Sequence, residues 1–368
     1  MPTRFDVVFE GGGAKGIALS GAVSALLDAG HALGRLVGTS AGAITATNLA
    51  LGYTPGEILA GSLVRTPSGA PIYTTFSEPP VLTEAELAGS GLFSVLRHEL
   101  APIPGVLGEH VDLALARAMG RLPGVASLVL LGEGGGLHRG DGFVRWMQGC
   151  LSDKGVPTDA TFADLHARTG RDLSVVATDT TDRRLLVLNH RTAPELPVVM
   201  GVRMSMSIPL YWTEVVWDAA WGRYRGEDVA GHAIVDGGVV SNFPLFLLTD
   251  PTDDEVAAVM GPPDPSHGSP VGLMLDPDLP VAGAPPPSPP TALHGLHRRL
   301  SALLDTLLSA RDNAVSDAHA GRIVRLPVEG YGTTEFDMPE PRVRALYDAA
   351  AAAARAWLDR SATAEVTA

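Results

Sequence analysis

The chain has 368 residues, of which 45% are apolar and 18% charged, so it folds around a sizeable core and is not disordered. Its net charge of -14 argues against nucleic acid as the main partner but leaves a membrane surface open. The single cysteine, Cys150, excludes an internal disulfide, fits a reducing cytoplasm and is expected to fill core space.

Strands and helices alternate along the first part of the chain. Residues 5–9 predict a buried strand, and residues 16–29 predict a helix because their apolar side chains recur at helical spacing. Leu36-Val37 predicts a second short strand, after which a turn enters a helix that Gly52 ends. Residues 54–160 are less regular, are rich in glycine and proline, and contain helical pieces near 84–100 and 109–120.

The second half continues the alternation of strands and helices. Its predicted elements are a hairpin over 172–190, a helix over 197–209 stopped by Pro209, a strand ending before Asp236, a strand over 270–276, a proline-rich connection over 277–291, an amphipathic helix over 292–320, a strand over 322–328 and a last helix to about residue 358. This order predicts an α/β fold with a largely parallel sheet.

A glycine loop follows the first strand, where Gly11, Gly13 and Gly16 form the pattern G-x-G-x-x-G. A dinucleotide-binding turn of this kind needs a carboxylate about 20 residues further on, at the end of the second strand, and no carboxylate lies between Gly30 and Ser40. A P-loop needs Ser or Thr after its lysine, but Lys15 is followed by Gly16. The bare amides of the loop, at a helix N-terminus, therefore predict an anion site that is not a nucleotide site.

A second motif, Gly38-Thr39-Ser40-Ala41-Gly42, is a G-x-S-x-G pentapeptide at a strand-to-helix turn. In that setting a sharp turn lifts the serine hydroxyl clear of the sheet, and small flanking residues prevent clashes. The alternative is a small-residue turn that serves packing alone. Parallel strands would bring Ser40 and the glycine loop to one edge of the sheet, so the loop anion is most simply an acyl-transfer oxyanion. Lys15 adds positive charge there or is a solvated surface lysine.

A serine nucleophile needs a base, and Asp236 follows a predicted strand. The next residues, Gly237 and Gly238, allow a tight turn that exposes the carboxylate. Taken alone, this Asp-Gly pair also fits an aspartate that only caps its own turn.

The three motifs GGGAKG, GTSAG and DGG, in this order, resemble the patatin-like phospholipase family. The segments RMSMSIP and VDGGVVSNFP look like the family's segments before and around its catalytic aspartate. The resemblance covers residues 5–52 and about 172–248, is weak over 55–165 and is absent after about residue 276.

This resemblance implies a three-layer α/β/α fold with a mostly parallel central sheet. It also implies that Ser40 is the nucleophile, that Asp236 takes its proton, and that loop amides form the oxyanion hole. Family members hydrolyse fatty-acyl esters of phospholipids, lysophospholipids or neutral glycerolipids, without a metal or other cofactor. The implied oxyanion-hole residues are Gly11, Gly12 and Gly13, and the motif-supporting residues are Lys15, Gly16, Gly38, Gly42, Gly237 and Gly238.

We expect a catalytic domain over 5–276 with a variable, partly helical insertion at about 55–165. A proline-rich connection over 277–291 and a helical extension over 292–368, packed on the same domain, would follow. The expected partner is a lipid or membrane-surface substrate; the sequence indicates neither an oligomeric state nor a regulatory partner. The early first strand leaves no room for a signal peptide, and residues 36–53 are too polar for a membrane span. We therefore expect a cytoplasmic location, with peripheral attachment to a membrane as the alternative.

Two other interpretations stay open. A lipid-binding or signalling module without catalysis would not need all three motifs intact. A Ser-His-Asp α/β-hydrolase would use a histidine after Asp236, namely His267, His294, His297 or His319. Separately, a leucine stripe in the predicted helix over 292–320 either packs on the core or faces lipid. Its members are Leu293, Leu296, Leu300, Leu303, Leu304, Leu307 and Leu308.

Overall fold

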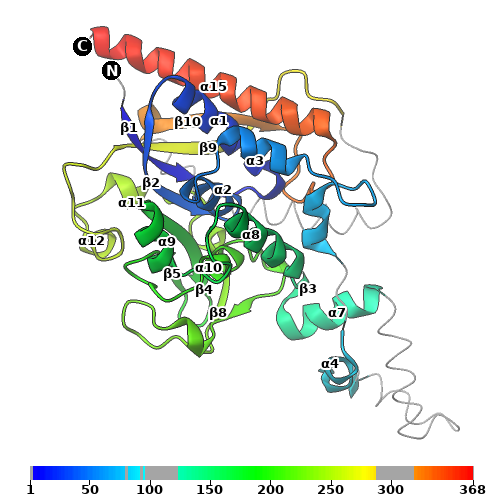
Figure 1. The fold of residues 1–368 in the computed structure, drawn as a ribbon. Coiled ribbons are helices and arrows are strands. Elements are labelled where there is room, and N and C mark those ends of the chain that lie inside the picture. The colour runs from blue at the N-terminus through cyan, green and yellow to red at the C-terminus, as the bar shows by residue number, and fades with distance from the viewer. Residues whose placement is uncertain (1–2, 79–81, 92–93, 96–122, 287–318, 368) are drawn as a thin grey trace, which may run out of the picture.

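The structure is a computed structural model that describes residues 3–78, 82–91, 94–95, 123–286 and 319–367 (Figure 1). The strands of its central sheet are β1 (Arg4–Phe9), β2 (Ala32–Thr39), β4 (Leu173–Asp179), β5 (Arg184–Leu188), β7 (Val215–Val216), β8 (Ala233–Asp236), β9 (Ser269–Pro280) and β10 (Ile323–Glu329). They form an eight-stranded sheet in the order β10-β9-β1-β2-β4-β8-β7, with β5 paired to β4. A separate two-stranded sheet joins β3 (Gly136–His138) and β6 (Leu210–Trp212).

The central sheet is mostly parallel. The strands β10, β9, β1, β2 and β4 run parallel to one another. Strands β5 and β8 pair with β4 in the antiparallel sense, and β7 pairs with β8 in the same way. The α/β fold and the mostly parallel sheet expected from the sequence are therefore confirmed. In a parallel sheet the carboxyl ends of the strands meet at one edge, and β1 and β2 there lead into the glycine loop and Ser40.

Apolar clusters cover both faces of the sheet, because successive strand residues point to opposite sides. Val7 faces the larger cluster and Val8 the smaller one. The larger cluster includes side chains from α1 (Ile17–Asp28), α2 (Ala41–Ala50), α8 (Asp141–Asp153), α9 (Phe162–Thr169), α10 (Val198–Ser205) and α15 (Glu340–Thr367). The smaller cluster includes side chains from the short helices α11 (Phe246–Thr249) and α12 (Asp254–Met260), so the third layer is thin.

The segment over 54–160 is more helical than its glycine and proline content indicates. Besides α8 it contains α3 (Pro55–Ser62), α4 (Glu84–Gly89) and α7 (Pro123–Gly134). A capping box of Thr54 and Glu57 starts α3, a signal that is visible in the sequence. The helical piece expected at 84–100 is interrupted: α4 ends at Gly89, and the described residues 91, 94 and 95 are again helical. The piece expected at 109–120 lies outside the described residues.

Helices α4 and α7 lie away from the body of the molecule (Figure 1). They share a small apolar cluster that is separate from the two sheet clusters. Its members are Leu82, Leu87, Ala126, Val129 and Leu130.

The sheet continues past residue 276. Strand β9 runs to Pro280, so the start of the expected proline-rich connection is still paired with β10, where Pro280 lies opposite Glu329. Strand β10 then forms the sheet edge, and α15 packs on α1 and β10 (Figure 1). The last helix extends to Thr367, beyond the expected end near residue 358. The leucine stripe expected between residues 293 and 308 lies outside the described residues. No described helix is both long and apolar enough to cross a bilayer.

Candidate active site

Ser40 occupies a strained turn between β2 and α2. Its backbone has φ 51° and ψ -119°, a conformation that costs a non-glycine residue on the order of 1–3 kcal/mol unless its surroundings hold it. The Ser40 N–H donates to Ser205 Oγ at 2.9 Å, and the Ser205 hydroxyl donates to the Val176 carbonyl at 2.6 Å. Ser205 on α10 thus ties the turn to strand β4, a role that the sequence analysis did not assign.

The glycines of the serine motif make room for this turn. A Cβ on Gly38 would lie 2.3 Å from the Gly42 carbonyl oxygen, and one on Gly42 would lie 2.1 Å from the Phe9 carbonyl oxygen. A Cβ on Gly16 would lie 2.8 Å from Ala41 Cβ, where the glycine loop meets α2. Larger residues at these positions would separate the two motifs, so these glycines set the distance between Ser40 and the glycine loop.

Asp236 ends β8 and is buried. It lies opposite Ala177 on β4, and the neighbouring residue of β4, Val176, pairs with Thr39 at the end of β2. Asp236 and Ser40 are thereby brought to the same part of the sheet edge. A Cβ on Gly237 would lie 2.3 Å from the Val176 carbonyl oxygen, which keeps the turn after Asp236 tight.

The two carboxylate oxygens of Asp236 have different surroundings. Oδ1 accepts a hydrogen bond from the Gly238 N–H at 2.8 Å, so the aspartate does cap its own turn. Oδ2 is buried and has no hydrogen-bond partner among the described residues. Burial raises the pKa of this carboxyl from 3.8 to about 7, against the opposing effects of the nearby Ser40 hydroxyl and the Gly238 amide. The unpaired Oδ2 is therefore the oxygen that can take a proton.

The glycine loop presents fewer donors than expected. The Gly11 N–H donates to the Asn242 carbonyl at 3.1 Å, and the Ala14 N–H donates to the Thr333 carbonyl at 2.8 Å. The Gly11 N–H therefore already has an acceptor, and a contribution of Gly11 to an oxyanion hole stays a prediction. The amides of Gly12 and Gly13 donate to no group in the described part of the chain. Gly13 has φ +57°, a backbone conformation that is strained for a residue with a side chain.

A buried polar pair fixes the loop on its other side. Asn242 Nδ2 donates to the Gly11 carbonyl at 3.1 Å and to Glu10 Oε1 at 3.3 Å. Glu10 Oε2 in turn accepts from the Leu275 N–H of β9. Lys15 contributes to the loop through its backbone N–H, which donates to the Gly12 carbonyl at 3.2 Å. Lys15 does not line the cavity beside Ser40 that is described next.

An apolar cavity opens beside Ser40. It encloses about 640 Å³ including the solvent at its mouth. Gly13 and Ser40 lie on its wall together with a majority of apolar side chains, which suits a hydrocarbon chain. The larger of these apolar side chains are Ile17, Ile44, Ile58, Tyr73, Phe76, Trp146, Met206, Trp212 and Phe336.

No described histidine lines this cavity. His267 and His319 precede β9 and β10, which run parallel to β1, so both lie toward the opposite end of the sheet from Ser40. The other two histidines of the triad alternative, His294 and His297, lie outside the described residues.

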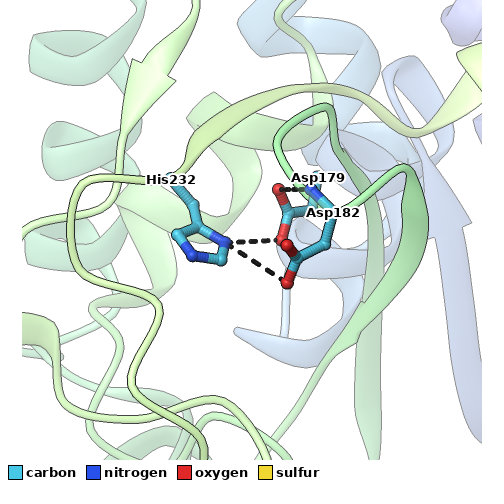
Figure 2. Close-up of side chains that lie close together, drawn as sticks. All are labelled: Asp179, Asp182 and His232. Atoms are coloured by element: carbon cyan, nitrogen blue, oxygen red, sulfur yellow. Dashed lines mark hydrogen bonds and ion pairs between the residues drawn. The ribbon is translucent and has the colours of Figure 1, made fainter.

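A separate cluster of potential metal ligands lies at the β4–β5 hairpin (Figure 2). His232 Nδ1 is 2.9 Å from Asp179 Oδ2 and 3.7 Å from Asp182 Oδ2. The guanidinium of Arg184 lies 3.6 Å from Asp179 and 3.4 Å from Asp182, so the carboxylates already have a cation. Asp179 Oδ1 also accepts from the backbone N–H groups of Thr181 and Asp182. We interpret the cluster as an ion-pair network that closes the hairpin.

Comparison with known proteins finds one curated relative and several solved structures that are similar to this chain. A curated relative, the uncharacterized protein YqhO of Bacillus subtilis (strain 168), is 27% identical over 350 residues, which are 93% of this chain and 94% of the relative. The solved structure of VipD from Legionella pneumophila matches with a TM-score of 0.45 and 17% identity, covering 98% of this chain and 67% of that one.

ExoU of Pseudomonas aeruginosa, solved in complex with SpcU, matches with a TM-score of 0.40 and 17% identity. The match covers 98% of this chain and 53% of ExoU, so this chain spans about half of ExoU's length. A family model described as patatin-like phospholipase matches residues 7–63 and 108–249, more than half of the chain. The chain therefore belongs to the patatin-like phospholipase family.

Proposed function

We propose that this protein is a serine-dependent lipid acyl hydrolase that cleaves fatty-acyl esters of phospholipids, lysophospholipids or glycerolipids. Membership of the patatin-like phospholipase family supports a lipid hydrolase activity. The observation that carries the finer proposal is the position of Ser40. It lies in a strained turn beside buried Asp236, on the wall of an apolar cavity that Gly13 also lines.

In the proposed acylation step, Ser40 Oγ attacks the ester carbonyl carbon and its proton passes to Asp236 Oδ2. The amides of Gly12 and Gly13 stabilise the negative charge that develops on the carbonyl oxygen. Collapse of this intermediate breaks the bond to the alcohol, which leaves with the proton from Asp236. The acyl group remains on Ser40 as an ester.

In the proposed deacylation step, Asp236 accepts a proton from water as the water oxygen attacks the acyl-enzyme. The fatty acid is released when the proton returns to Ser40 Oγ. A base whose pKa lies near 7 is well matched to this exchange, because it is available as a carboxylate at neutral pH and still binds the proton.

A Ser-Asp dyad accounts for the site better than the alternatives. A triad would place a histidine between Ser40 and Asp236, and among the described residues no histidine lines the cavity. A module without catalysis would have no need for a strained serine turn, for unpaired loop amides or for a carboxyl whose pKa burial has raised.

The test is release of fatty acid from vesicles that contain phospholipid, lysophospholipid and triacylglycerol, measured by mass spectrometry. Ser40→Ala is the inactive variant, and Ser24→Ala is the matched control. The Ser24 hydroxyl donates within α1 to the Gly21 carbonyl, and Ser24 does not line the cavity. We expect fatty acid from wild type and Ser24→Ala and none from Ser40→Ala. Release at the wild-type rate by Ser40→Ala would overturn the proposal.

A further inference from the structure

Two cavities of this protein share a wall. The cavity beside Ser40 adjoins a second one between α3 and α8, whose lining includes Tyr53, Gly61 and Cys150. The residues that line both are Asn48, Ile58, Tyr73 and Trp146. We propose that Tyr73 and Trp146 form a partition that limits the length of the acyl chain, and that the second cavity takes the distal end of a longer chain once the partition is opened. This inference rests on the proposed acyl hydrolase function.

The partition is built from aromatic side chains in two segments that are distant in sequence. Tyr73 and Phe76 come from the 3₁₀ turn η2 (Ile72–Ser77), and Trp146 comes from α8. The rings of Tyr73 and Trp146 meet edge to face, with centroids 5.8 Å apart and an interplanar angle of 83°. The ring centroid of Phe76 lies 5.3 Å from that of Trp146 and 5.4 Å from that of Phe143. Such contacts stabilise the cluster beyond the burial of its apolar area.

The turn that carries Tyr73 is held firmly against α8. A Cβ on Gly142 of α8 would lie 2.1 Å from the Thr75 carbonyl oxygen, so the two backbones are in close contact. Trp212 Nε1 donates to the Phe76 carbonyl at 3.3 Å, which fixes the other end of the turn. We therefore expect the aromatic wall to keep its position when a chain enters the first cavity.

The second cavity is apolar next to the partition and charged at its outer rim. Ile58 and Ile72 lie on its apolar side, and Glu57 and Asp153 are also part of its lining. Lys154 Nζ is 2.8 Å from Glu57 Oε1 and lies over the Tyr53 ring, 4.2 Å from its centroid. The inner part suits the methyl end of a hydrocarbon chain, and the charged rim disfavours further extension into it.

The experiment compares kcat/KM for p-nitrophenyl butyrate, octanoate and laurate. In Trp146→Ala we expect the laurate-to-octanoate ratio to rise at least about tenfold, because each additional buried CH₂ is worth roughly fourfold. Trp221→Ala is the matched control, because Trp221 is a half-buried tryptophan that does not line either cavity. Its ratio is expected to stay within about twofold of wild type.

A second substitution tests the role of the second cavity. Gly61 lines that cavity, and a Cβ on Gly61 would meet no atom within 4 Å. Gly61→Leu therefore fills the space from α3. In the Trp146→Ala background it should return the laurate-to-octanoate ratio to the wild-type value. If Trp146→Ala does not fold, as judged by thermal melting, Tyr73→Leu opens the same partition from η2 and gives the same test.

The outcomes separate this inference from the proposed function. An unchanged ratio in a folded partition variant would overturn the partition, and a gain that Gly61→Leu does not cancel would overturn the second cavity. Failure of the proposed function would look different: wild type would not hydrolyse the butyrate ester, or Ser40→Ala would hydrolyse it as fast as wild type.

Discussion

Replacing Asp236 by Asn should stabilise the folded protein at alkaline pH while removing nearly all of its activity. The ionised carboxyl opposes folding, because burial raises its pKa from 3.8 to about 7 and Oδ2 has no partner in the described part of the chain. An amide does not ionise, and its carbonyl oxygen can still accept the hydrogen bond from the Gly238 N–H. The variant therefore keeps the cap of the turn and loses the base.

The magnitude follows from proton linkage. In the unfolded chain Asp236 loses its proton near pH 3.8, whereas in the folded chain it loses it near pH 7. The stabilising effect of the raised pKa is fully present below pH 3.8 and is lost as the pH rises through about 7. One pKa unit corresponds to about 1.4 kcal/mol, so the whole window, from 3.8 to about 7, is worth at most about 4–5 kcal/mol of unfolding free energy. Between about pH 5 and pH 8 the free energy of unfolding of wild type should therefore fall by roughly 2–3 kcal/mol relative to that of Asp236→Asn.

Urea unfolding of both proteins at about pH 5 and about pH 8 measures this difference, because pH effects from other groups cancel in the comparison. Asp228→Asn is the matched control: Asp228 is exposed and caps a turn in the same way, with Oδ1 accepting from the Ala230 N–H at 3.2 Å. The control should change stability equally at both pH values. A pH-independent difference between wild type and Asp236→Asn would refute the reasoning.

Further predictions concern the pH profile, the serine turn and a buried ion pair. If Asp236 acts as the base, kcat/KM for a p-nitrophenyl ester should rise about tenfold per unit below pH 7 and level off above it; a profile that is flat from about pH 5 to 8 would contradict this. Ser205→Ala should lower kcat on the order of tenfold with little change in KM, because the buried Ser40 N–H loses its acceptor. An unaltered kcat in steady-state kinetics would show that Ser205 serves only the packing of α10 against the sheet. Arg35→Met should lower the free energy of unfolding by about 3–5 kcal/mol, because it leaves the buried Asp6 carboxylate, 2.6 Å from Arg35 Nε, without its cation. A free energy of unfolding in urea within about 0.5 kcal/mol of wild type would contradict this prediction.

Features of the fold with a local cause could be predicted from the sequence, and those with a tertiary cause could not. The strand at residues 5–9 and the turn at Ser40 have local signals, an apolar run and small flanking residues. Strand β2 was expected only at Leu36-Val37 but begins at Ala32. Its first half contains Arg35, which is buried in the sheet because Asp6 of β1 neutralises it, and neither residue alone indicates that pairing.

The candidate site divides in the same way. Ser40 and Asp236 lie in glycine-rich turns that can be recognised in the sequence. Ser205 acts through a hydrogen bond to Ser40, 165 positions away, which no local pattern indicates. The engagement of the Gly11 amide by Asn242 likewise depends on how distant segments meet. The cavity wall combines side chains from η2, α8 and the segment before α15, none of which shares a periodic pattern with the others.

Labelling with a fluorophosphonate, followed by peptide mass spectrometry, tests the Ser40–Asp236 pair most directly. The reagent forms a stable adduct with a serine that a neighbouring base activates. We expect an adduct on Ser40 in wild type, at least about tenfold slower labelling in Asp236→Asn, and no adduct in Ser40→Ala. An adduct on another serine, or labelling of Asp236→Asn at the wild-type rate, would contradict the assignment of Ser40 as nucleophile and Asp236 as its base.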